Sequence, residues 1–224
     1  MKALLASLAV MAAAPGIAHA QSAGGADEEL SSHFRTTQEQ VEHDQPTKAP
    51  ASRKTLAEFA RCVAEHDGLK ARVLLLQDFH QKTYHDALDK MLRANRDCVS
   101  KADHRSIGSG ELAFTAALAE ELLKRDAVPL NMRLAKAAAG KSAATFGPVD
   151  AAAMCTAKSA PDQVGGMFAS EPDSRAEGAA AEGLAPVLAA CAKAVGSPPI
   201  SATPFGLRTA LATAAFRLLA AQEA

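Results

Sequence analysis

The 224-residue sequence has no tryptophan, one tyrosine and eight phenylalanines, so aromatic side chains are scarce. Sugar-stacking platforms, aromatic cages and large all-β cores all need such side chains, which makes these sites and folds poor candidates. An excess of charge is also missing, because 24 Lys and Arg residues face 25 Asp and Glu residues. Nucleic acid and anionic membrane surfaces are bound through clusters of positive charge. The composition therefore argues against both partners, and its abundant alanine favours helices.

The N-terminal apolar run, Ala3 to Ala14, is shorter than the about 20 residues that span a bilayer. It follows Lys2 and precedes Ala18-His19-Ala20, which fits the small-x-small motif of a cleavage site. A positive residue, a short apolar run and such a site together form a secretory signal peptide. We therefore predict that residues 1–20 are removed and that the mature chain is periplasmic or secreted, with no membrane span.

Residues 21–54 contain few apolar side chains and include Gly24-Gly25 and Pro46. A segment of this composition buries too little apolar surface to fold alone, so we predict a flexible, disordered arm. His33 and His43 lie among acidic residues of this arm, which could collect a divalent metal weakly. Their spacings define no coordination geometry, so the sequence predicts no metal site and no cofactor there.

All four cysteines lie in the predicted mature chain, and an even number in an exported protein favours disulfides. Four cysteines allow three pairings. The spacing selects one of them, because Cys62 and Cys98 are 36 residues apart and so are Cys155 and Cys191. We predict the disulfides Cys62–Cys98 and Cys155–Cys191.

Apolar residues recur at helical spacing after the arm. A Thr55-x-x-Glu58 capping box, in which the hydroxyl and the carboxylate satisfy backbone N–H groups of the first turn, marks the first start. Asp67-Gly68 interrupts the helical spacing of apolar residues. A polar stretch at 100–110 predicts a loop before the last helix. The predicted helices are 56–66, a short helix carrying Ala71, Leu74 and Leu75, then 80–98 and 110–125.

The same pattern recurs later in the chain. An offset of 93 maps the first pair of cysteines onto the second pair, and an offset of 95 maps an apolar ridge that begins at Leu112 onto one that begins at Leu207. Two residues gained in one loop explain the change of offset. Helix-start signals recur as well, at Pro148, Ser174-x-x-Glu177 and Thr203-Pro204.

We therefore predict an all-α fold with two duplicated four-helix units, each stapled by one disulfide, after a disordered N-terminal arm. A connector with a short helix near 130–139 joins the two units. The predicted boundaries are 1–20 for the signal peptide, 21–54 for the arm, 55–125 for the first helical unit, 126–146 for the connector and 147–224 for the second helical unit.

Several short motifs, most of them near the cysteines, resemble those of other proteins. They are Cys62-Val63, Cys98-Val99, Leu184-Ala185-Pro186 before Cys191, and the Leu207-to-Leu219 helix. This pattern resembles a loose set of uncharacterised exported bacterial proteins with duplicated, cysteine-paired helical units. The resemblance implies the architecture, and it implies no activity, cofactor or catalytic residue.

The densest group of reactive side chains is His80, Tyr84 and His85. On a helix, His80 and Tyr84 share a face, and His85 and Asp89 are four residues apart, which would let them hold one metal or share a proton. The alternative is that these are exposed polar groups on a helix whose Leu88 faces inward. The sequence favours this alternative, because no spacing forces the reactive groups together.

The sequence also contains no recognisable motif of a catalytic nucleophile. The sequence has no G-x-S-x-G motif, and its cysteines are expected to be oxidised. His66 and His104 could approach the first disulfide across the helices, and a base also needs a defined geometry, which no spacing in the sequence imposes on them. We predict no catalytic residue.

The sequence thus favours an exported, non-catalytic helical envelope protein of unknown activity. Its expected partner is a protein or a small molecule, bound through the helical surface or a groove between the two units. The alternative is a small periplasmic enzyme or metal-binding protein that uses His80, Tyr84, His85 and Asp89.

Export makes a direct prediction about the N-terminus of the mature protein. N-terminal sequencing of the exported material should begin near Gln21, because the small-x-small motif ends at Ala20. Exported material that retains residues 1–20 would contradict the predicted signal peptide.

Overall fold

Helices form all of the regular secondary structure in the computed structural model, which describes residues 52–99 and 110–223. The all-α prediction is confirmed for these residues. The predicted signal peptide, nearly all of the predicted arm, and His104 lie outside the described residues. Within 52–99 and 110–223, no helix has the length and apolar content that a membrane span requires.

Helix α2 (Arg53–Leu75) begins earlier than predicted. Its N-cap is Ser52, whose hydroxyl accepts a hydrogen bond from the Thr55 backbone N–H at 3.1 Å. Thr55 therefore lies inside the helix and the predicted capping box is wrong, because a second hydroxyl residue three positions earlier takes the cap. The predicted interruption is confirmed, since Asp67 has non-helical angles (φ −125°, ψ 29°) and divides α2 into two segments.

The remaining helices of the first predicted unit and of the connector follow the predicted order. The predicted 80–98 helix is divided, because Asn95 leaves the helical conformation and a 3₁₀ turn follows. Leu112 is 62 % exposed and does not join the buried ridge predicted for its helix. The elements are α3 (Lys82–Ala94), η1 (Arg96–Cys98), α5 (Glu111–Leu123) and α6 (Leu130–Ala138), the last being the short helix predicted in the connector.

The second predicted unit contains four helices, and their start signals work largely as predicted. Pro148 lies in the first turn of its helix, and the Thr203 hydroxyl accepts a hydrogen bond from the Gly206 N–H at 3.1 Å. The Ser174 hydroxyl caps the Glu177 N–H at 3.1 Å. The helices are α7 (Pro148–Ser159), α8 (Pro161–Ala169), α9 (Arg175–Ala194) and α10 (Pro204–Glu223).

Both predicted disulfides are present, and they occupy matching places in the helix order. Cys62–Cys98 joins α2 to η1 with 5.8 Å between Cα atoms, and Cys155–Cys191 joins α7 to α9 with 5.6 Å. The break at Asp67 also has a counterpart, because Ala160 separates α7 from α8 with similar angles (φ −134°, ψ 55°). The internal repeat and its origin by duplication both stay predictions.

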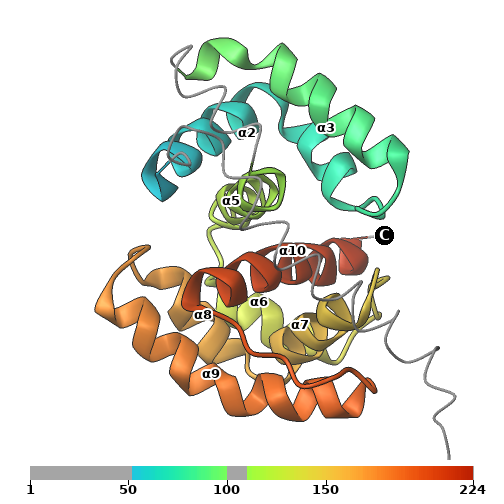
Figure 1. Cartoon of the computed structure of the whole chain (residues 1–224), viewed down its shortest axis with the longest axis vertical. Helices are drawn as coiled ribbons and strands as arrows, with labels where there is room; N and C mark the ends of the chain where they lie inside the picture. Colours follow the sequence, from blue (N-terminus) through green and yellow to red (C-terminus); the bar gives the residue numbers. More distant parts are fainter. Residues whose placement is uncertain (1–51, 100–109, 224) are drawn as a thin grey trace, which may run out of the picture. The chain divides into compact units, whose positions relative to one another are not determined.

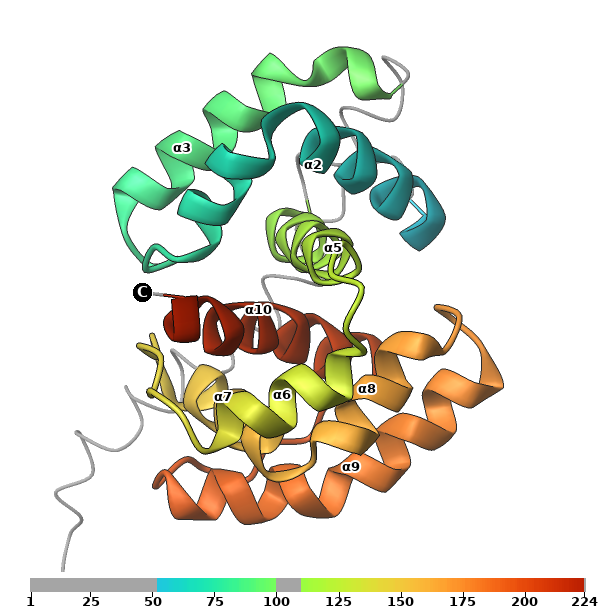
Figure 2. The same ribbon diagram turned by 180° about the vertical axis from the view of Figure 1, so that it is seen from behind.

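Helices α5 and α10, the last helix of each predicted unit, pack against each other (Figure 1). On the other side of α5 lies α2, followed by α3, and on the other side of α10 lie α7 and α9. Figure 2 shows α6 beside α7 and α8. The apolar core is therefore continuous from α2 through α5 and α10 to α7, as the fully buried Phe59, Phe114, Leu211 and Leu218 illustrate.

Helix α10 is buried on nearly all sides although it carries two arginines. The Arg208 side chain donates to both carboxylate oxygens of Glu120 in α5 at 2.8 Å, and to the carbonyl oxygens of Met167 and Ser170 at 3.0 Å. Its Nη1 also lies 3.4 Å from Glu177 Oε1 in α9. Several acceptors thus surround one charge that water cannot reach.

Glu177 extends this network to α2. Its two carboxylate oxygens accept hydrogen bonds from the Arg53 guanidinium at 2.6 and 2.7 Å, and one of them also accepts the Asp173 N–H at 2.8 Å. The carboxylate does not bond to Ser174, so only the serine half of the second predicted capping box is confirmed. Glu177 instead uses its charge to link α2, α9 and α10, and it is 1 % exposed.

Replacing Glu177 tests the network. The hydrogen bonds from Arg53, aided by the Asp173 N–H and the charges of Arg53 and Arg208, hold the Glu177 pKa below its usual 4.5 despite burial. Glu177→Gln should lower the free energy of unfolding at pH 7 by about 3 kcal/mol, the low end for removing one partner of a buried pair. Chemical denaturation with circular dichroism measures this loss.

The pH dependence has a fixed sign. A lowered carboxylate pKa stabilises the fold above the unfolded value of 4.5, and this stabilisation disappears as the pH falls through the folded pKa. The difference in the free energy of unfolding between wild type and Glu177→Gln should therefore shrink as the pH falls. Glu182→Gln, an exposed change in the same helix, should stay within about 0.5 kcal/mol of wild type at every pH. If the difference between wild type and Glu177→Gln does not change with pH, the ionised carboxylate is not what stabilises the fold.

Candidate functional site

The histidines and the tyrosine singled out in the sequence bind different neighbours. His80 Nε2 lies 2.6 Å from the carbonyl oxygen of Phe146, and His85 Nδ1 lies 3.1 Å from Glu111 Oε2. Asp89, the proposed partner of His85, instead lies 3.4 Å from an Arg93 nitrogen. The structure therefore places His80, His85 and Asp89 in three separate contacts.

Tyr84 points into the core. Burial raises the pKa of its phenol, so the group stays protonated and is a poor base. Nearby, Arg217 of α10 donates to an Asp150 carboxylate oxygen in α7, whose second oxygen accepts the Phe146 N–H at 2.8 Å. The Tyr84 and His85 rings meet edge to face at 5.5 Å between centroids, but one is buried and the other exposed. Tyr84 and the Arg217–Asp150 ion pair are therefore buried, whereas His80 and His85 are exposed.

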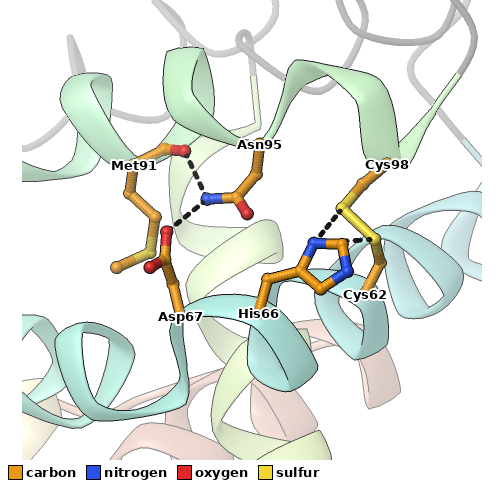
Figure 3. The surroundings of a disulfide bond; sticks show 6 residues. All are labelled: Cys62, His66, Asp67, Met91, Asn95 and Cys98. Carbon is orange, nitrogen blue, oxygen red and sulfur yellow. Dashed lines mark hydrogen bonds between the residues drawn. A yellow bond between two sulfur atoms is a disulfide. The ribbon is translucent and has the colours of Figure 1, made fainter.

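His66 approaches the first disulfide, one of the two approaches that the sequence left open. Its Nδ1 lies 3.9 Å from Cys62 Sγ and 3.8 Å from Cys98 Sγ, as Figure 3 shows. The second disulfide has a serine in the matching place, because Ser159 Oγ lies 3.9 Å from each of its sulfurs. The two cystines thus share their geometry and differ in the group beside the sulfurs.

A hydrogen-bonded pair next to His66 fixes the break in α2. Asn95 Nδ2 donates to Asp67 Oδ2 and to the Met91 carbonyl oxygen, each at 2.9 Å (Figure 3). Hydrogen bonds from Lys70 and Asn95 hold the pKa of Asp67 below its usual value, so the carboxylate is ionised at neutral pH. Asp67 and Asn95 therefore connect α2 to the end of α3 without using the disulfide.

A separate cavity of about 310 Å³ lies where the predicted connector meets both predicted units, and we call it the α5–α6–α8 pocket. Its apolar lining consists of Leu123, Ala127, Val128, Pro129, Leu130, Phe168 and Ala169, with Gly165 at the α8 side. Five polar residues also line it, and we call them its rim groups: Glu120, Lys124, Asp126, Asn131 and Arg133. Its size falls in the range of about 300–1,000 Å³ that small-molecule sites occupy.

The rim groups are already bound to other parts of the protein. Arg208 holds both oxygens of Glu120, and Lys124 lies 2.7 Å from Glu121. The Arg133 guanidinium donates to the carbonyl oxygens of Leu123 and Val128 at 2.5 and 3.0 Å. The polar groups of this pocket are therefore already bound within the protein.

Sequence reasoning missed the buried charges and the pocket. One signal was present, because Arg208 and Arg217 are the only charged residues between Pro204 and Gln222. A lone charge in an apolar helix requires a buried partner, since an unpaired charge is costly to bury. No comparable pattern marks the pocket, whose lining comes from three helices and a turn.

Comparisons with protein-family models, with curated proteins and with solved structures found no match to the chain.

Gly165 makes the close contact between α6 and α8 beside the pocket. A Cβ atom there would lie 2.9 Å from the Asn131 Cβ and 3.3 Å from its backbone nitrogen. Gly165→Ala should therefore destabilise the fold by about 1–3 kcal/mol through overpacking. Gly166→Ala is the matched control, since nothing lies within 4 Å of its added Cβ. It should stabilise the helix by up to about 1 kcal/mol. Equal effects of the two changes in thermal unfolding would contradict the close contact.

Proposed function

We propose that this protein is an exported, non-catalytic helical binding protein whose α5–α6–α8 pocket holds a small, mainly apolar molecule. The observation that carries the proposal is an apolar cavity of about 310 Å³ whose charged rim groups already have partners. A ligand gains most there by removing apolar surface from water, which contributes about 25 cal/mol per Å².

The chemistry of the rim argues against a strongly charged ligand. An anion would face the Glu120 and Asp126 carboxylates. The two cations of the lining, Lys124 and Arg133, are already paired with acidic residues. A cation would have to replace Arg208 as the partner of Glu120. Breaking a buried, hydrogen-bonded ion pair is costly because it leaves a charge without a partner. An uncharged molecule avoids this cost and is recognised by shape.

Export is supported by the two disulfides, which persist in oxidising compartments. A periplasmic or secreted location remains part of the proposal. The alternative of an enzyme or metal protein built on His80, Tyr84, His85 and Asp89 has less support, because these side chains bind different neighbours.

Filling the pocket tests the proposal. The probe is N-phenyl-1-naphthylamine, an uncharged dye whose fluorescence rises in apolar surroundings, and a protein without tryptophan adds little background emission. The wild-type protein should bind one equivalent. Ala169→Phe places a ring at the pocket lining and should weaken binding at least about tenfold, which corresponds to about 1.4 kcal/mol.

The control adds the same ring to the same helix away from the pocket. Gln163 is exposed in α8 and does not line the cavity, so Gln163→Phe should leave dye affinity unchanged. Non-saturable dye binding, or equal affinities for the two variants, would overturn the proposed site.

A further inference from the structure

The surroundings of the first disulfide contain three potential metal ligands. Cys62 Sγ, Cys98 Sγ and His66 Nδ1 all lie within 4.8 Å of one another. Thiolate sulfur and imidazole nitrogen are common zinc ligands in proteins. In the disulfide the two sulfurs are bonded to each other, so the ligand set exists only after reduction.

We propose that Cys62, Cys98 and His66 form a redox-gated zinc site that is closed as a disulfide and binds one Zn²⁺ after reduction. A dithiol reductant supplies two electrons and two protons to the Cys62–Cys98 bond and itself becomes a disulfide. Zn²⁺ then displaces the two thiol protons and takes two thiolates and one imidazole nitrogen as ligands. Water completes the fourth position.

The nitrogen is already placed for this geometry. Tetrahedral Zn²⁺, with bonds of about 2.3 Å to sulfur and about 2.0 Å to nitrogen, requires N···S separations of about 3.5 Å. The observed separations of His66 Nδ1 are 3.9 Å to Cys62 and 3.8 Å to Cys98. The two sulfurs must move apart, and the nitrogen must approach them by a few tenths of an ångström. The metal-bound tautomer carries its proton on Nε2, which leaves the Nδ1 lone pair for the ion.

The backbone around the site has a restraint that survives reduction. Asn95 joins Asp67 of the α2 break to the Met91 carbonyl of α3 through two hydrogen bonds of 2.9 Å. Cys98 follows Asn95 by three residues, and His66 precedes Asp67. These bonds keep both segments close together when the disulfide opens, so the ligands are not released into separate parts of the chain.

The site is also open to an ion. His66 is exposed, Cys62 and Cys98 are half-buried, and an open groove of about 560 Å³ runs past His66 between the α2 break and the end of α5. The second disulfide lacks these properties, because Cys191 is 3 % exposed and Ser159 replaces the histidine. The proposal therefore applies to the first disulfide alone, and it does not depend on the α5–α6–α8 pocket.

Zinc titration of the full chain tests the proposal. The protein is reduced with a phosphine, which avoids zinc-binding dithiols, and is titrated without oxygen against a chromophoric zinc chelator. Reduced wild type should bind one equivalent of Zn²⁺ that the oxidised protein does not bind.

His66→Ser places a serine beside the sulfurs, as in the second disulfide, and should weaken zinc binding at least about tenfold. Loss of even an outer-shell partner of a zinc ligand lowers metal affinity about 10–100-fold. His85→Ser, a change at another exposed histidine, should leave the affinity unchanged.

Two further measurements identify the ligands and guard against unfolding. Co²⁺ in place of Zn²⁺ should give a thiolate-to-metal absorption band in reduced wild type and none in the Cys62→Ser, Cys98→Ser double variant. If reduction lowers the helix content measured by circular dichroism, Zn²⁺ should restore it in wild type and fail to do so in His66→Ser. Equal zinc affinity of wild type and His66→Ser, or equal binding by the oxidised protein, would overturn the proposal.

Discussion

The fold depends on keeping the charge of Arg208 inside a helix that water hardly reaches. A buried guanidinium without acceptors would be strongly unfavourable, so the residues packed around this side chain must supply acceptors for its N–H groups. Glu120 comes from α5, Glu177 comes from α9, and two carbonyl oxygens come from the end of α8 and the residue that follows it. Four segments therefore have to meet at one point, which fixes α10 relative to its neighbours more specifically than apolar packing alone.

The same constraint shapes the α5–α6–α8 pocket. Glu120 stands at its rim, and because both carboxylate oxygens are held by Arg208 the rim presents little free charge. Phe168 lines the pocket and also lies under the Arg208 guanidinium, 5.5 Å from ring centroid to charge. The apolar character that suits the pocket for an uncharged molecule is thus a consequence of the buried ion pairs beside it.

The two disulfides show how one framework carries different chemistry. Each closes a span of 36 residues, for which the chain-entropy model gives about 3–4 kcal/mol of stabilisation. The group beside the sulfurs is an imidazole in one case and a hydroxyl in the other. A hydroxyl is a weak zinc ligand, so the proposed metal chemistry belongs to the half of the chain that carries His66.

Much of this fold could be predicted from the sequence. Helix caps and the break at Asp67 depend on residues that are near one another in the chain, and the disulfide pairing follows from two equal cysteine spacings. Two of these local predictions were nevertheless wrong. The first helix is capped by Ser52 and not by Thr55, and the Glu177 carboxylate binds Arg53 and does not close a capping box. Only the tertiary structure decided which charges meet. Arg208 and Glu120 are 88 residues apart, and the approach of His66 to Cys98 depends on how α2 bends against α3. Such contacts follow from the packing of whole helices, which a pattern read along one segment does not contain.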